Sequence, residues 1–285
     1  MTGSRGAPVP DTQRLSVTAR RKQLVDVVDL RGYCVVAELA TMFDVSEMTI
    51  RRDISELSLQ HHVVKFHGGV RSKGSLRAFM PDYAERTFSQ RVVKRRIAEL
   101  AIQLVDPGTT VGLDAGTTVS ELAQLLPLEI ELRVITASLT VAELLISKKN
   151  VEVTSLGGVL RRETLSFIGT FGVESLSRLQ MDTVFLGAHG LSRRGVFDAT
   201  DQDATIKRSM IRSTDRVVLL ADSSKFAKKA MTQICDWSAV DVLVTDDGIT
   251  NAQHDMLLQR GVEVHLASSS GSLSETDDLE EIEAG

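Results

Sequence analysis

Residues 36–57 read VAELATMFDVSEMTIRRDISEL, and this stretch decides the fold of the N-terminal part of the chain. Its apolar residues recur at helical spacing before and after a polar break at Asp44. Ser46 is a good N-cap for the second helical segment, and Val45 before it can pack back onto that helix. The stretch therefore predicts two short helices joined by a tight turn.

The second of these helices has a buried face and a polar face. Ile50, Ile54 and Leu57 form the buried stripe, which leaves two adjacent arginines facing outward. Arginines and small hydroxyls near a helix N-terminus suit phosphate oxygens and base edges in a major groove. A solvated helix is the alternative, but the helix-turn-helix spacing and a following basic hairpin favour DNA binding. The expected DNA-contacting residues of this helix are Ser46, Glu47, Met48, Thr49, Arg51 and Arg52.

The flanking residues complete a winged-helix pattern over residues 18–73. Thr18–Leu30 predicts a leading helix, and Val63–Phe66 followed by Gly68-Gly69 predicts a β-hairpin. An ordinary solvated hairpin is the alternative to a DNA-contacting wing at each of its basic residues. The wing residues expected to reach the sugar-phosphate backbone are Lys65, His67 and Arg71.

Composition and charge are consistent with a globular protein that binds DNA at one end. The 285 residues leave room for two domains, and 42% hydrophobic and 25% charged residues are ordinary values. Residues 1–77 carry 12 Lys or Arg and 8 Asp or Glu, a balance of +4, whereas residues 78–285 carry 21 and 30, a balance of −9. The chain has no apolar run of about 18 residues and no apolar signal-peptide core. Cys34 and Cys235 lack metal-ligand spacing, so we expect a cytoplasmic protein without a metal or cofactor.

The rest of the chain predicts an α/β domain over residues 91–267. We expect a disordered leader at 1–17, a linker at 74–90 and a disordered acidic tail at 268–285. A helix over Gln90–Val105 leads into short apolar runs that alternate with helical segments, which is typical of a mostly parallel sheet covered on both faces. The predicted strands are 111–113, 132–136, 151–156, 181–187, 215–221, 241–245 and 262–266.

Small and polar residues follow these predicted strands, and ligands of parallel sheets bind outside the carboxyl ends of the strands. Asp114–Thr118, DAGTT, opens a helix with hydroxyls and free amides that suit a phosphate; a plain turn with an N-cap threonine is the alternative. The other strand ends offer hydroxyls, glycines, carboxylates and lysines, each with a structural role as its alternative. Together they predict a site for an anionic, polyhydroxylated ligand. Its expected residues are Asp114, Gly116, Thr117, Thr118, Thr136, Ser138, Gly157, Gly158, Arg161, His189, Lys207, Asp222 and Lys225.

The ordered series of motifs resembles the DeoR family of bacterial transcriptional regulators over almost the whole of residues 19–266. The resemblance rests on residues 36–57 and HGGV at 67–70, then on DAGTT, VITASL, LGGVLR, FLGAHGL and LLADSSKF. It implies a winged helix-turn-helix joined to a sensor domain similar to sugar-phosphate isomerases and CoA transferases. It further implies a homo-oligomeric repressor of sugar catabolism genes that a phosphorylated sugar releases from its operator, with Asp114–Thr118 as the phosphate-binding loop.

Two residues depart from the pattern of this family. Ala137 stands where the family commonly has Asn, and His189 stands where it commonly has Asp. Both replacements remove partners of sugar hydroxyls, which suggests a changed effector.

Two other functions stay open at this point. The chain could be a sugar-phosphate isomerase with a DNA-binding appendage, or an architectural DNA-binding protein whose α/β domain only oligomerises. No carboxylate–histidine pair and no GxSxG, HExxH or Walker pattern identifies a catalytic set. We therefore predict a DNA-binding regulator and not an enzyme.

Overall fold

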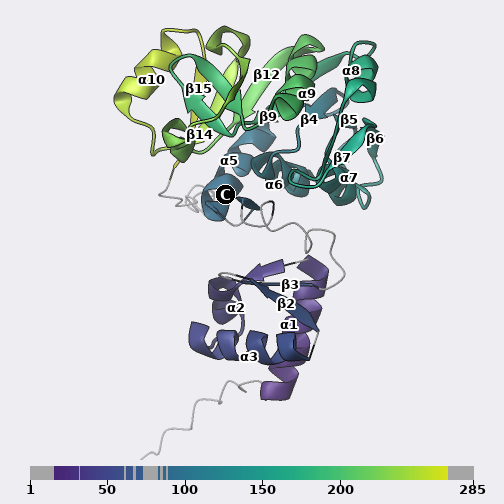
Figure 1. Ribbon diagram of the computed structural model, residues 1–285, viewed down its shortest axis with the longest axis vertical. Coiled ribbons are helices and arrows are strands. Elements are labelled where there is room, and N and C mark those ends of the chain that lie inside the picture. The colour runs from purple at the N-terminus through teal and green to yellow at the C-terminus, as the bar shows by residue number, and fades with distance from the viewer. Residues whose placement is uncertain are drawn as a thin grey trace, which may run out of the picture. The chain divides into compact units, whose positions relative to one another are not determined.

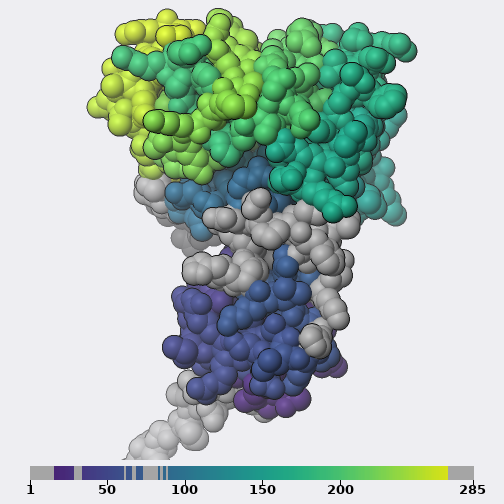
Figure 2. Space-filling view, in the orientation of Figure 1, coloured from purple at the N-terminus to yellow at the C-terminus, as the bar shows by residue number. Residues whose placement is uncertain are grey.

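The computed structural model describes residues 16–31, 33–60, 62–66, 69–72, 83, 86–87 and 89–268. They belong to two compact units, which are residues 1–84 and 85–285. Figure 2 shows them in a space-filling view. Most of the predicted leader, linker and tail lies outside the described residues, as does His67. No helix among the described residues is long and apolar enough to span a membrane.

The N-terminal unit is a winged helix, as predicted. Its helices are α1 (Val17–Arg31), α2 (Val36–Met42) and α3 (Glu47–Leu59), and its strands are β1 (Tyr33–Val35), β2 (Val63–Phe66) and β3 (Gly69–Ser72). The strands form an antiparallel sheet in the order β1-β3-β2. The hairpin of β2 and β3 is the predicted wing, whereas β1 was not predicted because three residues carry too little periodicity.

The turn between α2 and α3 forms as the sequence predicts. Asp44 takes a positive φ of 49°, which a short polar residue tolerates better than an apolar one. The hydroxyl of Ser46 accepts a hydrogen bond from the amide of Thr49 at 3.3 Å and caps α3. The predicted stripe of α3, Ile50 and Ile54 among it, is buried against α1 and α2 residues in one apolar cluster.

The C-terminal unit is built on a seven-stranded sheet in which every neighbouring pair is parallel. The strand order is β15-β14-β12-β9-β4-β5-β6, and all seven predicted strands are confirmed with ends shifted by at most one residue. The strands are β4 (Thr110–Leu113), β5 (Leu132–Thr136), β6 (Val151–Ser155), β9 (Met181–Gly187), β12 (Thr214–Leu220), β14 (Val242–Asp246) and β15 (Glu263–Ala267).

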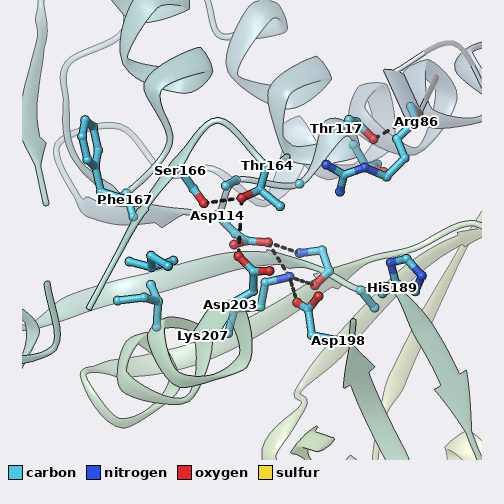
Figure 3. Close-up of a pocket in the computed structure, with 18 of the residues that line it drawn as sticks. Arg86, Asp114, Thr117, Thr164, Ser166, Phe167, His189, Asp198, Asp203 and Lys207 are labelled. Atoms are coloured by element: carbon cyan, nitrogen blue, oxygen red, sulfur yellow. Dashed lines mark hydrogen bonds and ion pairs between the residues drawn. The ribbon is translucent and has the colours of Figure 1, made fainter. Parts of the chain in front are cut away.

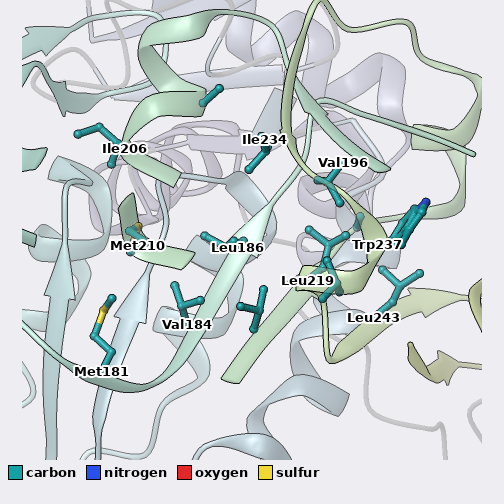
Figure 4. Close-up of a cluster of buried hydrophobic side chains, with 14 of the residues drawn as sticks. Met181, Val184, Leu186, Val196, Ile206, Met210, Leu219, Ile234, Trp237 and Leu243 are labelled. Carbon is teal, nitrogen blue, oxygen red and sulfur yellow. The ribbon is translucent and has the colours of Figure 1, made fainter. Parts of the chain in front are cut away.

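Helices cover both faces of this sheet, as Figure 1 shows. The apolar side chains of α5 (Arg91–Ala101), α6 (Thr117–Leu125) and α7 (Leu139–Leu145) pack on one face. Those of α8 (Thr170–Leu176), α9 (Asp201–Arg212) and α10 (Asn251–Leu258) pack on the other, in the cluster shown in Figure 4. Both faces are buried, which explains why these strands are almost continuously apolar.

The predicted helix over Gln90–Val105 was too long. The α-helix ends at Ala101 and continues only as the 3-10 turn η2 (Ile102–Leu104). Pro107 lies shortly afterwards and disfavours helical backbone in the residue before it, so the helix must end early.

Several short elements beside the main sheet were not predicted. Strands β7 (Val159–Arg161) and β8 (Ser166–Ile168) form a hairpin, while a second small sheet joins β10 (Gly190–Ser192), β11 (Gly195–Asp198) and β13 (Thr232–Cys235). The turns η3 (Ser223–Ala227) and η4 (Trp237–Ala239) flank β13. These elements matter because several of them contribute side chains to the ligand pocket described below.

The order of the strands reverses between β4 and β9. After β4 the chain adds β5 and β6 on one side, and from β9 onward it adds β12, β14 and β15 on the other. The loops that leave the ends of β4 and β9 therefore diverge, which opens a crevice at the carboxyl end of the sheet. Ligands of open α/β sheets bind at such a switch point.

Candidate functional site

A pocket lies at this switch point, and it gathers residues from distant parts of the chain. Asp114 follows β4, Thr117 begins α6, His189 follows β9, and Lys207 projects from α9. Figure 3 shows them around one hollow, although 93 positions separate Asp114 from Lys207 in the sequence. The predicted ligand-binding residues that line it are Asp114, Gly116, Thr117, Thr118, His189, Lys207 and Lys225.

Lys207 forms the floor of the pocket together with two carboxylates. Its Nζ lies 3.0 Å from Asp114 Oδ2, 2.7 Å from Asp198 Oδ2 and 2.8 Å from the carbonyl oxygen of Gly187. A lysine ammonium has three protons, so these three acceptors use its full capacity. Asp114 is fixed in turn, because its Oδ2 also accepts a hydrogen bond from the amide of Gly187 at 3.0 Å.

The floor carries its charges at neutral pH. Burial alone would lower the pKa of Lys207, but the charges of Asp114 and Asp198 outweigh burial and raise it. Burial likewise would raise the pKa of Asp198, but the ammonium of Lys207 holds that pKa below its ordinary value. One ammonium thus balances two carboxylates, and the floor has a net charge of about −1.

Gly116 and Gly187 let the end of β9 lie against the start of α6. A Cβ on Gly116 would lie 3.3 Å from the Cα of Gly187, and one on Gly187 would lie equally close to Gly116. Side chains at these positions would push the two loops apart. The glycine of the DAGTT motif therefore serves the close approach of two backbones as well as the turn itself.

The rim of the pocket is positive, in contrast to its floor. Arg86 and Lys225 line it, and the charge of Arg86 is one of the causes that lower the pKa of Lys225, after burial. Burial and the charge of Lys225 also lower the pKa of His189, so its imidazole is neutral at pH 7. The N-terminus of α6 begins beside these side chains, at Thr117, and adds its partial positive charge.

Six predicted ligand residues are absent from the lining of this pocket, and three of them have structural roles. Thr136 is fully buried and donates a 2.6 Å hydrogen bond to the carbonyl of Leu113. The hydroxyl of Ser138 caps α7 by accepting from the amide of Val141 at 3.1 Å. A Cβ on Gly158 would lie 2.3 Å from the carbonyl oxygen of Ile168, so its glycine serves the β7–β8 hairpin. Gly157, beside it, has open space at its Cβ position.

The remaining two predicted residues act through neighbours that do line the pocket. Arg161 lies 3.0 Å from Asp203 and donates to the hydroxyl of Thr200 at 2.6 Å. Asp222 is buried at the start of η3, where its carbonyl accepts from the amide of Lys225 at 3.0 Å. They position Asp203 and Lys225.

Five polar residues of the pocket were missed by the sequence reasoning. Arg86 fell in the predicted linker, and the others lie on or next to the short strands β8 and β11 or on α9, away from the predicted strand ends. The missed residues are Arg86, Thr164, Ser166, Asp198 and Asp203.

The polar side of α3, which is predicted to contact DNA, has the exposure that was predicted. Glu47, Met48, Arg51 and Arg52 are exposed, and Thr49 is half-buried. Arg51 pairs with Glu47 at 3.2 Å, one helical turn away, while Arg52 makes no hydrogen bond or ion pair with any other residue the structure describes.

The two described wing residues differ in how far they can reach. Lys65 is exposed, and its Nζ lies 3.2 Å from the hydroxyl of Ser55 on α3. Arg71 is half-buried on β3, its Nε is shielded from solvent, and burial lowers its pKa. Of the two, Lys65 is the more exposed side chain.

An ion-pair clamp holds the DNA-facing helix in place. Asp53, buried on α3, accepts from Nε of Arg20 at 2.7 Å and from Nε of Arg21 at 2.9 Å, both on α1. A buried carboxylate paired on both oxygens is held rigidly, and it fixes the orientation of α3 against α1. Asp53 lies at helical spacing from Ile50 and Leu57, on the buried stripe of α3, but the pattern does not identify the arginines that pair with it.

Comparisons with known proteins agree across both units. The model of the DeoR-like helix-turn-helix domain matches residues 20–75, and that of the DeoR C terminal sensor domain matches residues 89–247. An uncharacterized HTH-type transcriptional regulator of Bacillus subtilis is 34% identical over 87% of this chain and 96% of its own. The glycerol-3-phosphate regulon repressor of Escherichia coli is 32% identical over 80% of this chain and 90% of its own. Among solved structures, a ribose 5-phosphate isomerase A of Methanocaldococcus jannaschii covers 48% of this chain and 54% of its own, with 18% identity and a TM-score of 0.36.

Proposed function

Because the chain belongs to the DeoR family of transcriptional regulators, we propose that it is a DNA-binding repressor that a phosphorylated sugar releases from its operator. The observation that carries the proposal is the polarity of the pocket. A positive rim at the start of α6 faces a floor of ion-paired carboxylates. The name of one relative, a glycerol-3-phosphate regulon repressor, supports the choice of a phosphorylated carbon compound.

The polarity of the pocket orients such a ligand. The phosphate binds at the rim, where Arg86, Lys225 and the free amides of α6 offer donors. The sugar hydroxyls face away from the rim, where Ser166 and Asp203 line the pocket beside the floor and offer acceptors. Neutral His189 can donate or accept one further hydrogen bond in place of the carboxylate that the family commonly has there.

We assign no reaction to this pocket. An isomerase needs a general base, and a base is effective when its pKa lies near the working pH. Asp198 is held ionised by Lys207 with a pKa below its ordinary value, which makes it a poor base. Burial raises the pKa of Asp203, but its carboxylate is already engaged by the hydroxyl of Thr200 at 2.8 Å and by Arg161 at 3.0 Å. Neutral His189 has no carboxylate hydrogen-bonded to its ring among the described residues, so nothing there orients it for proton transfer.

The proposal includes a cytoplasmic homo-oligomer on DNA. Helix-turn-helix proteins that bind as dimers read two half-sites spaced by about one helical turn of DNA. Sedimentation of the protein alone and with its operator tests this part. A single half-site bound by one monomer would contradict it.

The test of the whole proposal is operator release. A duplex is first selected from random DNA by the full-length protein, and its affinity is measured by fluorescence anisotropy. Triose, pentose and hexose phosphates are then added, each beside its unphosphorylated sugar as the matched control. Release by a phosphorylated compound alone is the expected result. Selective DNA binding that none of them alters would refute the effector class, and turnover of any of them, followed by NMR, would revive the isomerase.

A further inference from the structure

Arg86 joins the pocket to the point where the C-terminal unit begins. That unit starts at Glu85, directly after the DNA-binding unit, so Arg86 is its second residue. Arg86 nevertheless lines the ligand pocket, together with Thr117 and Lys225 from elements far along the chain. Ligand occupancy and the chain segment entering from the DNA-binding unit therefore meet at one residue.

Contacts of both its side chain and its backbone hold Arg86 in place. Its guanidinium donates to the carbonyl of Glu163, in the turn between β7 and β8. Its own carbonyl accepts from the ammonium of Lys94 and, at 3.5 Å, from the hydroxyl of Thr117. Figure 3 shows Thr117 and Arg86 together at one side of the pocket, apart from the floor residues.

Lys94 anchors this segment to the core of the C-terminal unit. It is only 3% exposed, and besides the carbonyl of Arg86 it binds the carbonyl of Ser89 at 2.7 Å. Its helix α5 is fixed by Ile97 and Ala98, which are fully buried in the apolar cluster on one face of the sheet. The backbone around Arg86 is thus tied to a rigid helix through one side chain.

A bound phosphate would compete for the contacts that Arg86 makes now. The hydroxyl of Thr117 has a single proton, so it cannot donate to a phosphate at the start of α6 and to the carbonyl of Arg86 together. The guanidinium of Arg86 forms its strongest contacts with phosphate in a bidentate arrangement, and such a contact would draw on the side chain that now donates to the carbonyl of Glu163. Both changes act on the same residue, while Lys94 keeps its hold on the carbonyl.

We propose that Arg86 binds the anionic group of the effector and that Lys94, as a positioning residue, holds the backbone of Arg86 on α5 so that this contact changes operator affinity. This inference rests on the proposed function, since it describes how the same pocket controls operator binding. It assigns the signal to a side chain at the very start of the sensor unit. A ligand shifts an equilibrium only through contacts that differ between the two states, and Arg86 supplies such a difference.

The binding half of the proposal is tested with Arg86→Ala. Affinity for inorganic phosphate, and for the sugar phosphate that releases the wild-type protein, is measured by calorimetry on the full chain. We expect a loss of tenfold or more for both ligands. Arg162→Ala is the matched control, because Arg162 is an exposed arginine on the same β7–β8 turn that lies outside the pocket lining, and its removal should leave both affinities unchanged.

The coupling half is tested with Lys94→Met. The readout is the release ratio, which is the operator affinity of each variant without the sugar phosphate divided by its operator affinity with the sugar phosphate. We expect ligand affinity within threefold of wild type and a ratio at least tenfold smaller. Lys148→Met is the matched control, because Lys148 is also a buried lysine that binds a backbone carbonyl, that of Leu126, outside the pocket lining. Lys94→Gln, which keeps a donor, provides a second variant if the methionine does not fold.

The outcomes separate this inference from the proposed function. If a sugar phosphate releases the wild-type protein, and Arg86→Ala binds inorganic phosphate and that sugar phosphate as tightly as the wild type does, the binding half alone is overturned. If a sugar phosphate releases the wild-type protein, and folded Lys94→Met and Lys94→Gln show the same ratio of operator affinities without and with it, the coupling half alone is overturned. If no sugar phosphate binds the wild-type protein, the proposed function fails and the inference fails with it.

Discussion

Replacing Lys207 by methionine should destabilise the C-terminal unit strongly at neutral pH. Lys207 is 8% exposed, and its ammonium is held by two carboxylates and one carbonyl at 2.7–3.0 Å. Methionine fills nearly the same volume but leaves Asp114 and Asp198 facing each other without a counter-charge. Breaking a buried ion pair by removing one partner costs about 3–5 kcal/mol, and we expect a loss of that size in the free energy of unfolding at pH 8.

The loss should shrink as the pH falls. In the wild-type protein the pKa of Asp198 lies below its ordinary value. The ionised carboxylate therefore contributes stability at any pH above the pKa of an unfolded aspartate, and this contribution is lost as the pH falls through the lower pKa of the folded state. In the variant burial would raise that pKa, because Lys207 no longer opposes it. The folded variant then binds more protons than the unfolded chain, and its stability decreases as the pH rises. The difference between the two proteins is therefore smallest near pH 4.5 and largest near pH 8.

Trp237 makes the measurement specific to this unit. It is the only tryptophan of the chain, it is fully buried, and its indole donates to the carbonyl of Ser192 at 2.8 Å. Urea unfolding followed by its fluorescence thus reports on the C-terminal unit, while the winged helix is silent. The double variant Lys207→Met with Asp198→Asn removes one of the unpaired charges and should recover part of the loss. A loss below about 1 kcal/mol at pH 8, or one that does not vary with pH, would refute the reasoning.

Three further predictions concern the DNA-binding unit and the anchor lysine. Asp53→Asn removes the carboxylate that Arg20 and Arg21 share and should weaken operator binding at least tenfold by anisotropy; unchanged affinity would show that α3 does not need this clamp. Arg52→Ala should cost about 1–3 kcal/mol of operator binding, limited to the selected sequence if it contacts a base, or shared with random DNA and with a shallower salt slope if it contacts phosphate. Lys94 should titrate with a pKa of about 8 in carbon NMR, because burial and then Lys225 disfavour its charge, and a value near 10.5 would contradict this. Since that folded pKa is below the unfolded one, the stability of the C-terminal unit should rise between pH 8 and 10.5.

The winged helix could be predicted almost completely from the sequence because its signals are local. Apolar spacing fixes α2 and α3, and the turn between them follows from Asp44 and the cap at Ser46. The clamp on Asp53 could not be predicted, because its partners lie 32 and 33 residues away in the sequence. Asp53 falls on the buried stripe of α3 between Ile50 and Leu57, but an acidic residue is almost never fully buried unless it is paired, and the pairing arginines come from α1.

The pocket could be predicted only in part. The residues directly after β4 and β9 line it as the strand-end rule implies, since both strands flank the switch point. Asp198 ends a four-residue strand, β11, that carries little periodicity, so neither the strand nor its role was visible. Thr136 and Ser138 also follow a strand, but β5 lies one strand away from the switch point, and their hydroxyls bind backbone instead.

Hydrogen-bond capacity decides which cations of the pocket remain for a ligand. The sequence suggested that Lys207 and Lys225 could both meet an anion, yet the ammonium of Lys207 is already engaged by two carboxylates and one carbonyl oxygen. The side chain of Lys225 makes no hydrogen bond or ion pair with another residue that the structure describes, and the guanidinium of Arg86 has five donors. Substitutions at the floor should therefore act mainly on stability, and those at the rim mainly on effector affinity. If Lys225→Ala lowered stability as much as Lys207→Met and left effector affinity intact, the anion would not bind at the rim.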